Sequence, residues 1–410
     1  MRLTMSTRNE LKRDESRRYQ ASGRKGKIAI LQEFCRITGY NRHYAAYILR
    51  NHGRRVAVSG VSGERFILEG SHRLKKRRRS RPRVYGPDVY EALYPFWELL
   101  NYPCGKRLKA CLPEICRKAL EFAELEIAED VVEKLKLISA ATIDRMLQVD
   151  RAKGVMKCRS KTKPGTLLKH QIALRTGGEW DEGEVGFTEV DLVSHDGGCT
   201  RGEFGYTLNM TEIESGWVEL GALPNRAQVW VLDLIKQIRG KLPFNLRGID
   251  SDNGGEFINN HLHTYCLQEG IEFTRSRAYR KNDNCHVEQK NYMAVRSYVG
   301  HSRYDRKEEI EALNKLYQTL CPFLNFFQPQ AKLQKKERWG SRVKKTYDLP
   351  RTPYLRLLES DQISPEAKTE LTRIYRQLNP FALKRDIEKI QNTLLKLNHE
   401  KRKGGPDYAA

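Results

Sequence analysis

Three acidic residues hold comparable places in the central part of the 410-residue chain. Asp191 lies in the strand-like stretch TEVDLV, Asp252 ends a later strand-like stretch in GIDSDNGGEF, and Glu288 lies in the helix-like stretch NCHVEQKNYMAV. Carboxylate oxygens are the ligands that Mg²⁺ prefers, and two such ions about 3.5–4 Å apart activate a hydroxyl and stabilise the charge of phosphoryl transfer. The three acids are therefore predicted to bind two Mg²⁺ ions, with Mn²⁺ as a substitute, and to act on phosphodiesters.

Several polar residues stand close to these acids in the sequence. Asp250 is two residues before Asp252, so the two side chains share one face of an extended strand. Further candidates for contacts around the metal site or with the substrate are Asn253, His195, His286 and Lys290. Two alternatives stay open, because Asp252 could instead cap a turn and the two histidines could pack in the core or lie on the surface.

The segments that must hold these acids alternate between strand-like and helix-like patterns from residue 186 onward. GFTEVDLV is β-rich and alternating, YTLNMTEI and GWVELGALP follow as further strands, and AQVWVLDLIKQI is helical. A strand ending at Asp252, a helix over 255–269, the strand IEFTRSR and the helix with Glu288 complete the order βββαβαβα. This order predicts an α/β core over 186–327, built on a mixed five-stranded sheet with helices on both faces.

The charge of the chain points to a polyanionic partner. The formal net charge is +23, and residues 1–85 hold 23 Lys and Arg against 6 Asp and Glu. Residues 186–300, by contrast, hold 12 basic and 15 acidic residues. Nucleic acid, as double-stranded DNA, is the first predicted partner and an anionic membrane the second. The acids of the central region would need cations before a phosphate could approach them.

Other classes of protein are disfavoured. No run of about 18 apolar residues occurs, so no membrane span is expected, and the opening stretch MRLTMSTRNELKRDESRRYQ lacks the apolar core of a signal peptide. The nine cysteines form no Cys-x-x-Cys pair, which favours a reduced, cytoplasmic protein. Cys104, Cys111 and Cys116 could hold zinc, but three buried thiols are the preferred interpretation.

Residues 1–72 are the first candidate DNA-binding domain. Within 27–50, two helix-like stretches flank Thr38-Gly39-Tyr40, which is the layout of a helix-turn-helix motif. The second helix would enter the major groove with its leading residues, Asn41, Arg42 and His43. The alternative is a plain helical hairpin within a bundle.

A basic linker over 73–84 follows. Its stretch RLKKRRRSRPR holds eight cations in eleven residues, which repel one another too strongly to fold alone. We expect it to contact phosphates or a minor groove, or else to be a solvated spacer. The predicted contact residues are Arg77, Arg78, Arg79, Arg81 and Arg83.

Residues 85–150 are predicted to form a second helical domain that resembles a helix-turn-helix, with Thr142 and Arg145 facing outward for DNA. Small helical bundles share this pattern, so the DNA-binding interpretation has an alternative. Residues 151–185 contain Gly and Pro among basic residues and are predicted to be a second basic linker.

Two short regions complete the chain. Residues 328–360 are predicted to form a small basic module, either a β module or an ordered arm, that contacts DNA through Lys335, Lys336, Arg338 and Arg342. Residues 361–410 are predicted to be a helical tail. Its apolar residues recur every three to four positions and form a narrow stripe, which is expected to bind a partner helix.

The acids also carry a resemblance to a known family. The pieces EVDLV, IDSDNGGEF and HVEQKN, with 35 residues between Asp252 and Glu288, resemble the DDE transposase and retroviral-integrase superfamily, specifically bacterial insertion-sequence transposases with an integrase-type core. The resemblance implies an RNase H-like core in which Asp191, Asp252 and Glu288 bind Mg²⁺. Its motif places the ligand immediately before Asn-Gly, which selects Asp252, so Asp250 is expected to tune the metal site electrostatically or to face the substrate. The resemblance also implies a homo-oligomer that cleaves the ends of a mobile element and joins the 3′-hydroxyls to target DNA. The zinc-binding HHCC bundle of the retroviral enzymes has no match in this sequence.

Two other functions compete with this interpretation. The first is an RNase H-fold nuclease that cuts nucleic acid without joining it, although such an enzyme would not need two helix-turn-helix units and a long basic linker. The second is a transposase-derived DNA-binding regulator with an inactive core. The intact set of Asp191, Asp252 and Glu288 argues against that regulator.

Overall fold

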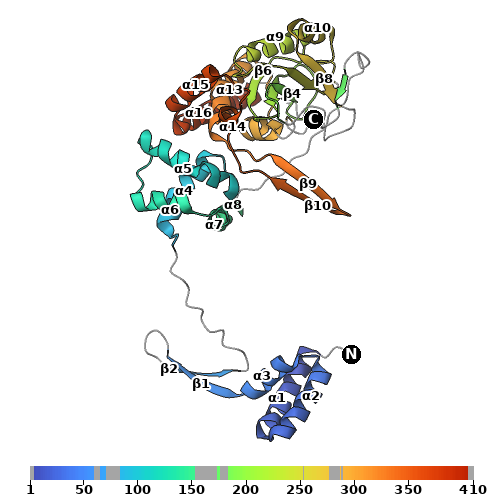
Figure 1. Ribbon diagram of the computed structural model, residues 1–410, viewed down its shortest axis with the longest axis vertical. Helices are drawn as coiled ribbons and strands as arrows, with labels where there is room; N and C mark the ends of the chain where they lie inside the picture. The colour runs from blue at the N-terminus through green and yellow to red at the C-terminus, as the bar shows by residue number, and fades with distance from the viewer. Residues whose placement is uncertain are drawn as a thin grey trace. The chain divides into compact units, whose positions relative to one another are not determined.

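The computed structural model describes residues 4–59, 65–70, 84–152, 173–175, 183–252, 254–276, 287 and 290–404. The chain divides into two compact units, Met1–Val84 and Tyr85–Ala410, each of which has its own fold (Figure 1). Several predicted site residues lie outside the described residues, namely Glu288, Asn253, His286, Arg77, Arg78, Arg79, Arg81 and Arg83.

The first unit holds three described helices and a β-hairpin. The helices are α1 (Met5–Ala21), α2 (Arg24–Thr38) and α3 (Arg42–Asn51). They pack around a small apolar core that includes Phe34 and Leu49. Gly39, with a φ of 72°, ends α2 in the left-handed region that glycine adopts without strain, so the predicted turn is present. The strands β1 (Arg54–Ser59) and β2 (Arg65–Gly70) pair antiparallel.

The second unit begins with a run of short helices. These are α4 (Pro87–Leu99), α5 (Gly105–Glu121), α6 (Glu129–Leu137), α7 (Ala140–Met146) and α8 (Gln148–Ala152). Ser139 begins α7, because its hydroxyl accepts a hydrogen bond from the backbone N–H of Thr142 at 3.2 Å. The apolar faces of these helices join one continuous core with the rest of the unit.

A mixed β-sheet is the centre of the second unit. Its strands are β3 (Ala173–Arg175), β4 (Phe187–Ser194), β5 (Tyr206–Glu212), β6 (Val218–Leu223), β7 (Gly248–Ser251) and β8 (Glu272–Ser276). They lie in the order β3-β8-β7-β4-β5-β6, with β4, β5 and β6 antiparallel and the other pairs parallel. The five predicted strands are present. The short strand β3 adds a sixth at the edge of the sheet, from a segment predicted to be linker.

Helices cover both faces of this sheet, as the sequence predicts (Figure 1). The helices α9 (Gln228–Arg239) and α10 (Asn260–Glu269) pack on one face, against a core that includes Val190 and Ile249. The opposite face, which includes Val193, shares its core with the π-helix η1 (Asn291–Arg296), α12 (Ser297–Val299) and α13 (Lys307–Phe327). Because side chains alternate along a strand, odd-numbered and even-numbered residues of β4 face different cores.

The edge strand β6 is closed by two asparagines of α13. The side chain of Asn314 pairs with both the N–H and the carbonyl of Ala222, at 2.7 and 3.0 Å. Asn325 pairs in the same way with Val218, at 2.9 and 2.8 Å. These amides satisfy backbone groups that an exposed edge would offer to another strand, so α13 protects the sheet from edge-to-edge pairing.

The chain after α13 forms a hairpin and three helices. The strands β9 (Leu333–Trp339) and β10 (Arg342–Tyr347) pair antiparallel as a two-stranded ribbon (Figure 1). The helices α14 (Pro353–Glu359), α15 (Pro365–Gln377) and α16 (Pro380–Gly404) follow. The small β module expected over 328–360 is thus a hairpin followed by a short helix.

The apolar stripe of the tail has a partner inside the same chain. Leu371, Tyr375, Ile387 and Leu394 are buried in the core shared with α13 and the early helices of the unit. The fully buried Lys118 of α5 also donates hydrogen bonds to the carbonyls of Tyr375 and Arg376, both at 3.0 Å. The reason for expecting a partner helix from another chain was therefore wrong, since α5 and α13 cover the stripe.

Two further expectations concern membranes and thiols. Among the described residues, no helix is long and apolar enough to cross a membrane. Cys111 and Cys116 are buried free thiols, whereas Cys104 is exposed, so the expectation of three buried thiols holds for two of them.

Candidate active site

The pairing of β4 with β7 brings Asp191 and Asp252 to the same level of the sheet. These strands are parallel, with Glu189 beside Asp250 and Val190 beside Ser251. The next residues along the two strands are Asp191 and Asp252. Neighbouring strands lie about 4.8 Å apart, and side chains at matching positions point to the same face. Two acids that are separated by sixty residues in the sequence are thereby placed side by side.

Asp252 lies directly beyond the end of β7, where a glycine leaves room for a second carboxylate. Its Oδ1 accepts a hydrogen bond from the N–H of Gly254 at 2.8 Å. A Cβ on Gly254 would come within 2.9 Å of that oxygen and 2.6 Å of the carboxyl carbon of Glu256. Burial raises the pKa of Asp252, and burial together with the charge of Asp252 raises that of Glu256. Such a pair favours a cation, because a cation offsets the cost of burying negative charge.

Asp191 is oriented by its neighbours on three elements. Its Oδ1 accepts a hydrogen bond from the N–H of Leu192 at 2.8 Å, and its Oδ2 accepts one from the side-chain amide of Asn291 at 2.5 Å. The oxygen of that amide accepts in turn from Asn209 at 2.9 Å. Asn209 lies opposite Asp191 on β5, and Asn291 begins η1. The carboxylate therefore has a fixed rotamer before any ligand arrives.

Glu288 lies outside the described residues, but described residues on both sides of it in the sequence contact the sheet. The N–H of Val287 donates to Oε2 of the fully buried Glu189 at 2.9 Å. The carbonyl of Val287 accepts from Asn209 at 3.4 Å, and Asn291 contacts Asp191. Val287 and Asn291 are therefore both attached to β4 and β5 near Asp191.

The structure describes the surroundings of three of the predicted neighbours. His195 is fully buried, with Nε2 2.7 Å from the hydroxyl of Thr207, and burial lowers its pKa to about 3, so it is a neutral core residue. Asp250 is also fully buried, and its Oδ1 accepts from the hydroxyl of Thr274 at 2.6 Å. Lys290 donates to the carbonyl of Gly216 at 3.2 Å rather than to an acid.

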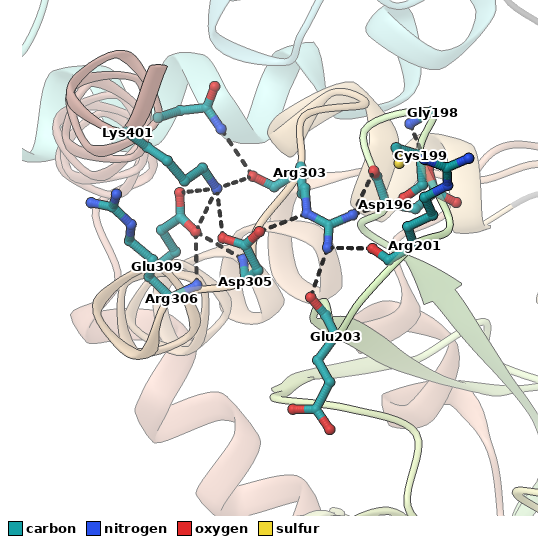
Figure 2. A network of polar contacts seen from close by, with 11 residues as sticks. Asp196, Gly198, Cys199, Arg201, Glu203, Arg303, Asp305, Arg306, Glu309 and Lys401 are labelled. Carbon is teal, nitrogen blue, oxygen red and sulfur yellow. Dashed lines mark hydrogen bonds and ion pairs between the residues drawn. The ribbon is translucent and has the colours of Figure 1, made fainter. Parts of the chain in front are cut away.

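Arg303 binds several backbone carbonyls of the loop that follows β4, as Figure 2 shows. The guanidinium of Arg303 donates to the carbonyls of Cys199, Arg201 and Glu203 at 2.7, 2.9 and 2.8 Å. It also donates to Asp305 at 2.6 Å, and the carbonyl of Arg303 accepts from Lys401 of α16 at 2.8 Å. The connection between β4 and β5 is thus tied to the last helix of the unit.

The described atoms best suited to a metal ion are the carboxylate oxygens of Asp191 and Asp252, which lie on neighbouring strands. Hard cations such as Mg²⁺ take carboxylate oxygens and keep some of their own waters. Within the described part of the chain, no group of three or more His, Cys, Asp or Glu side chains is close enough to hold a metal ion. Asp191 of β4 and Asp252, directly after β7, fit a metal ion by their chemistry and their burial. The ion would need at least one further ligand.

The predicted DNA-contact residues that the structure describes lie at helix starts and on the hairpin. Arg42 and His43 are exposed, and Asn41 caps α3 by accepting from the N–H of Tyr44 at 2.8 Å. The guanidinium of Arg145 donates to the hydroxyl of Thr142 at 3.0 Å. The remaining ones lie in β9 and β10: Lys335, Lys336, Arg338 and Arg342.

Sequence reasoning missed four residues of the site. Glu189, Asn209, Asn291 and Glu256 surround the two acids, yet none of them was singled out. Asn291 had a usable signal, because residues three apart on a helix are neighbours and Asn291 is three positions after Glu288. Glu189 had a weaker one, since it shares a strand face with Asp191. The place of Asn209 beside Asp191 depends on the register between β4 and β5, which cannot be read from the sequence.

No protein-family model matches the chain. The curated relative is the uncharacterized protein y4rM of Sinorhizobium fredii (strain NBRC 101917 / NGR234), 36% identical over 355 residues, which cover 87% of this chain and 96% of the relative. Similar solved structures include the catalytic core domain of BIV integrase, at 17% identity and a TM-score of 0.28, over 47% of this chain and 99% of that one. Another is the HTLV-2 integrase catalytic core domain in complex with magnesium, at 14% identity and a TM-score of 0.27, over 35% and 88%.

Proposed function

We propose that this chain, which belongs to the same family as the uncharacterized protein y4rM of Sinorhizobium fredii, is a DNA transposase. It would bind the terminal inverted repeats of a mobile element, cleave the element ends and join the 3′-hydroxyls to target DNA. The observation that carries the proposal is the placement of Asp191 and Asp252 at one level of two paired parallel strands. The SDNGGEF stretch around Asp252 and the spacing to Glu288 support it.

The proposed roles follow from the chemistry of phosphoryl transfer. Asp191, on the central strand β4, would hold the metal ions together with Asp252 and Glu288. Two Mg²⁺ ions, or Mn²⁺ in their place, would supply the charge that activates the attacking hydroxyl and stabilises the leaving oxygen. The chain's own contribution is orientation, because Asn291 and Asn209 fix the carboxylate of Asp191.

Contact with DNA is assigned to the basic parts of the chain. The residues Asn41, Arg42 and His43 at the start of α3 are proposed to read the major groove, and Thr142 and Arg145 of α7 to act similarly as a second helix-turn-helix. The cations of 73–84 and of the β9–β10 hairpin are proposed to bind phosphates. We further propose that copies of the chain assemble on DNA, since two element ends must be held together for joining.

Incubation of the full chain with DNA that flanks its own gene, in Mg²⁺, tests this function directly. The expected products are nicked element ends and molecules in which a 3′-hydroxyl is joined to target DNA. Both should be absent with EDTA and for Asp252→Asn. Cleavage without joined products would favour an RNase H-fold nuclease. Specific binding without any cleavage would favour a DNA-binding regulator, and neither outcome is compatible with a transposase.

A further inference from the structure

Two cations from different parts of the second unit meet at one turn. Lys290 donates from Nζ to the carbonyl of Gly216 at 3.2 Å, and the side-chain amide of Gln330 donates to the same oxygen at 3.4 Å. Arg107 of α5 donates from Nε to the carbonyl of Pro329, the residue before Gln330, at 2.6 Å. Gly216 has a φ of 74°, and a Cβ there would come within 2.6 Å of the Gln330 side chain, so this close meeting depends on the glycine.

Both cations are bonded to backbone carbonyls, and within the described part of the chain neither Arg107 nor Lys290 forms an ion pair with a carboxylate. A guanidinium carries five N–H donors and an ammonium carries three, so one carbonyl each leaves most of their donors available. Arg303 shows the contrast, because carbonyls of the β4–β5 loop and Asp305 surround its guanidinium (Figure 2). The side chains of Arg107 and Lys290 are only partly exposed. Burial lowers the pKa of both, that of Lys290 to about 7 with a contribution from the charge of Arg107.

The position of this pair relates it to the candidate active site. Lys290 immediately precedes Asn291, which donates to Asp191. Arg107 belongs to the helical region that precedes the sheet in the sequence. An anion held by both side chains would therefore contact the helical region and the segment leading into η1 at the same time.

We propose that Arg107 and Lys290 together bind one phosphate group of the DNA backbone beside the active site. This proposal rests on the proposed function for the identity of its ligand. A phosphodiester offers two acceptor oxygens, which suit the planar fork of Arg107 and the single charge of Lys290. Binding at this point would fix the DNA strand relative to Asp191 and would explain why two cations lie together without an acid.

The test measures DNA affinity of the full chain over a salt series, in EDTA, so that cleavage plays no part. Arg107→Gln and Lys290→Gln are compared with wild type and with Lys106→Gln, which removes an exposed cation from the neighbouring position of the same helix. Loss of one phosphate contact should lower the slope of log affinity against log salt by about 0.9. The double variant should lose no more than either single one, because both residues bind one phosphate.

A second arm locates the phosphate. Methylphosphonate groups, which lack the charge, are placed singly along the duplex, and one position should weaken wild type but leave Arg107→Gln and Lys290→Gln unaffected. Inorganic phosphate at matched ionic strength should not compete, whereas competition would indicate a site for free phosphate and overturn the DNA assignment.

Unchanged salt slopes with a lower melting temperature would show that the two cations only brace the turn. If the wild-type protein binds and cleaves DNA and the two variants bind DNA equally well, this proposal is overturned and the proposed function is not. Wild type that binds no DNA overturns the proposed function as well.

Discussion

The acid-bearing face of the central sheet and the β9–β10 hairpin handle charge in opposite ways. On the sheet, Glu189 and Asp250 are fully buried, and burial raises the pKa of Asp252. On the hairpin, every residue of β10 is exposed, and seven Lys and Arg stand against one Glu over residues 331–347. One region concentrates negative charge where water is scarce, and the other displays positive charge in water.

This difference indicates how strictly the positions of the charged residues are defined in each region. Buried carboxylates are costly, so they persist only where hydrogen bonds fix them or a cation offsets their charge, and their positions are therefore narrowly defined. Exposed cations cost little and gain little until a polyanion arrives, so their number matters more than their positions. Substitutions should thus act steeply on the sheet and gradually on the hairpin.

The largest effect should come from the acids themselves. Asp191→Asn, Asp252→Asn and Glu288→Gln should each lower strand cleavage on the order of a thousandfold, because each removes several kcal/mol of transition-state stabilisation. DNA affinity in a gel-shift assay should stay within a few-fold of wild type. Asp233→Asn, on the exposed side of α9, is the matched control and should cleave normally. Near-normal cleavage by any of the three variants would remove that residue from the site.

A smaller effect should follow from loosening the segment around Glu288. Glu189→Ala removes the acceptor for the N–H of Val287 and should lower cleavage about 10–100-fold, as expected for a residue that orients a metal ligand. Glu189→Gln keeps an oxygen acceptor and should recover much of the rate. The apparent affinity for Mn²⁺, followed by electron paramagnetic resonance, should fall with the alanine variant. If the two variants were equally impaired, the charge of Glu189 would matter rather than its hydrogen bond.

The hairpin should respond more gradually. Replacing Arg338, Arg342 and Lys344 with Ala should lower the slope of log DNA affinity against log salt by about 2–3, with similar losses on specific and scrambled duplexes. The rate of cleavage at saturating DNA should change little. A charge-matched control replaces the exposed Lys307, Lys389 and Lys396 with Ala and should leave the slope unchanged. Equal slopes for the two triple variants would mean that the hairpin does not touch DNA.

The smallest effect tests what burial alone costs an acid that has no proposed role in catalysis. Burial raises the pKa of Glu219 to about 7, although the indole N–H of Trp217 donates to it at 2.9 Å. Because the folded state prefers the protonated form, the free energy of unfolding should fall as pH rises from about 4.5 to 7 and then level off. Glu219→Gln should therefore stabilise the protein by about 1–3 kcal/mol at pH 8 and by little at pH 4. Urea denaturation at both pH values measures this, and an equal gain at both would contradict the assigned cause.

The sequence was informative where a pattern is local. The alternation in GFTEVDLV predicts β4, and the Asn-Gly pair that follows Asp252 in the sequence predicts the end of β7, so the strands beside Asp191 and Asp252 could be identified. The order of strands and helices then predicted helices on both faces of a mixed sheet. These features depend on neighbouring residues and on chain connectivity, which a single sequence contains.

Features that depend on distant partners could not be predicted. His195 looked like a site residue because it is four positions after Asp191, yet its burial depends on Thr207 and the helices above it. The tail stripe looked free because α5 lies more than 250 residues earlier in the chain. Asp191 and Asp252 lie at the same level of the sheet only because of the register between β4 and β7. A shift of one residue would have placed the two acids on opposite faces.

The hydrogen bonds of Arg303 also have a consequence for the order in which the protein folds. The carbonyl of Arg303 accepts from Lys401, which is made 98 residues later. At about 5–20 residues per second, a ribosome needs about 5–20 s to add them. During that interval the β4–β5 connection exists without its final support, although the strands that carry Asp191 and Asp252 are already synthesised. We expect the β4–β5 connection to be the last part of the second unit to become protected in pulse-labelling hydrogen exchange, because its support by Arg303 is completed only after Lys401 has been synthesised.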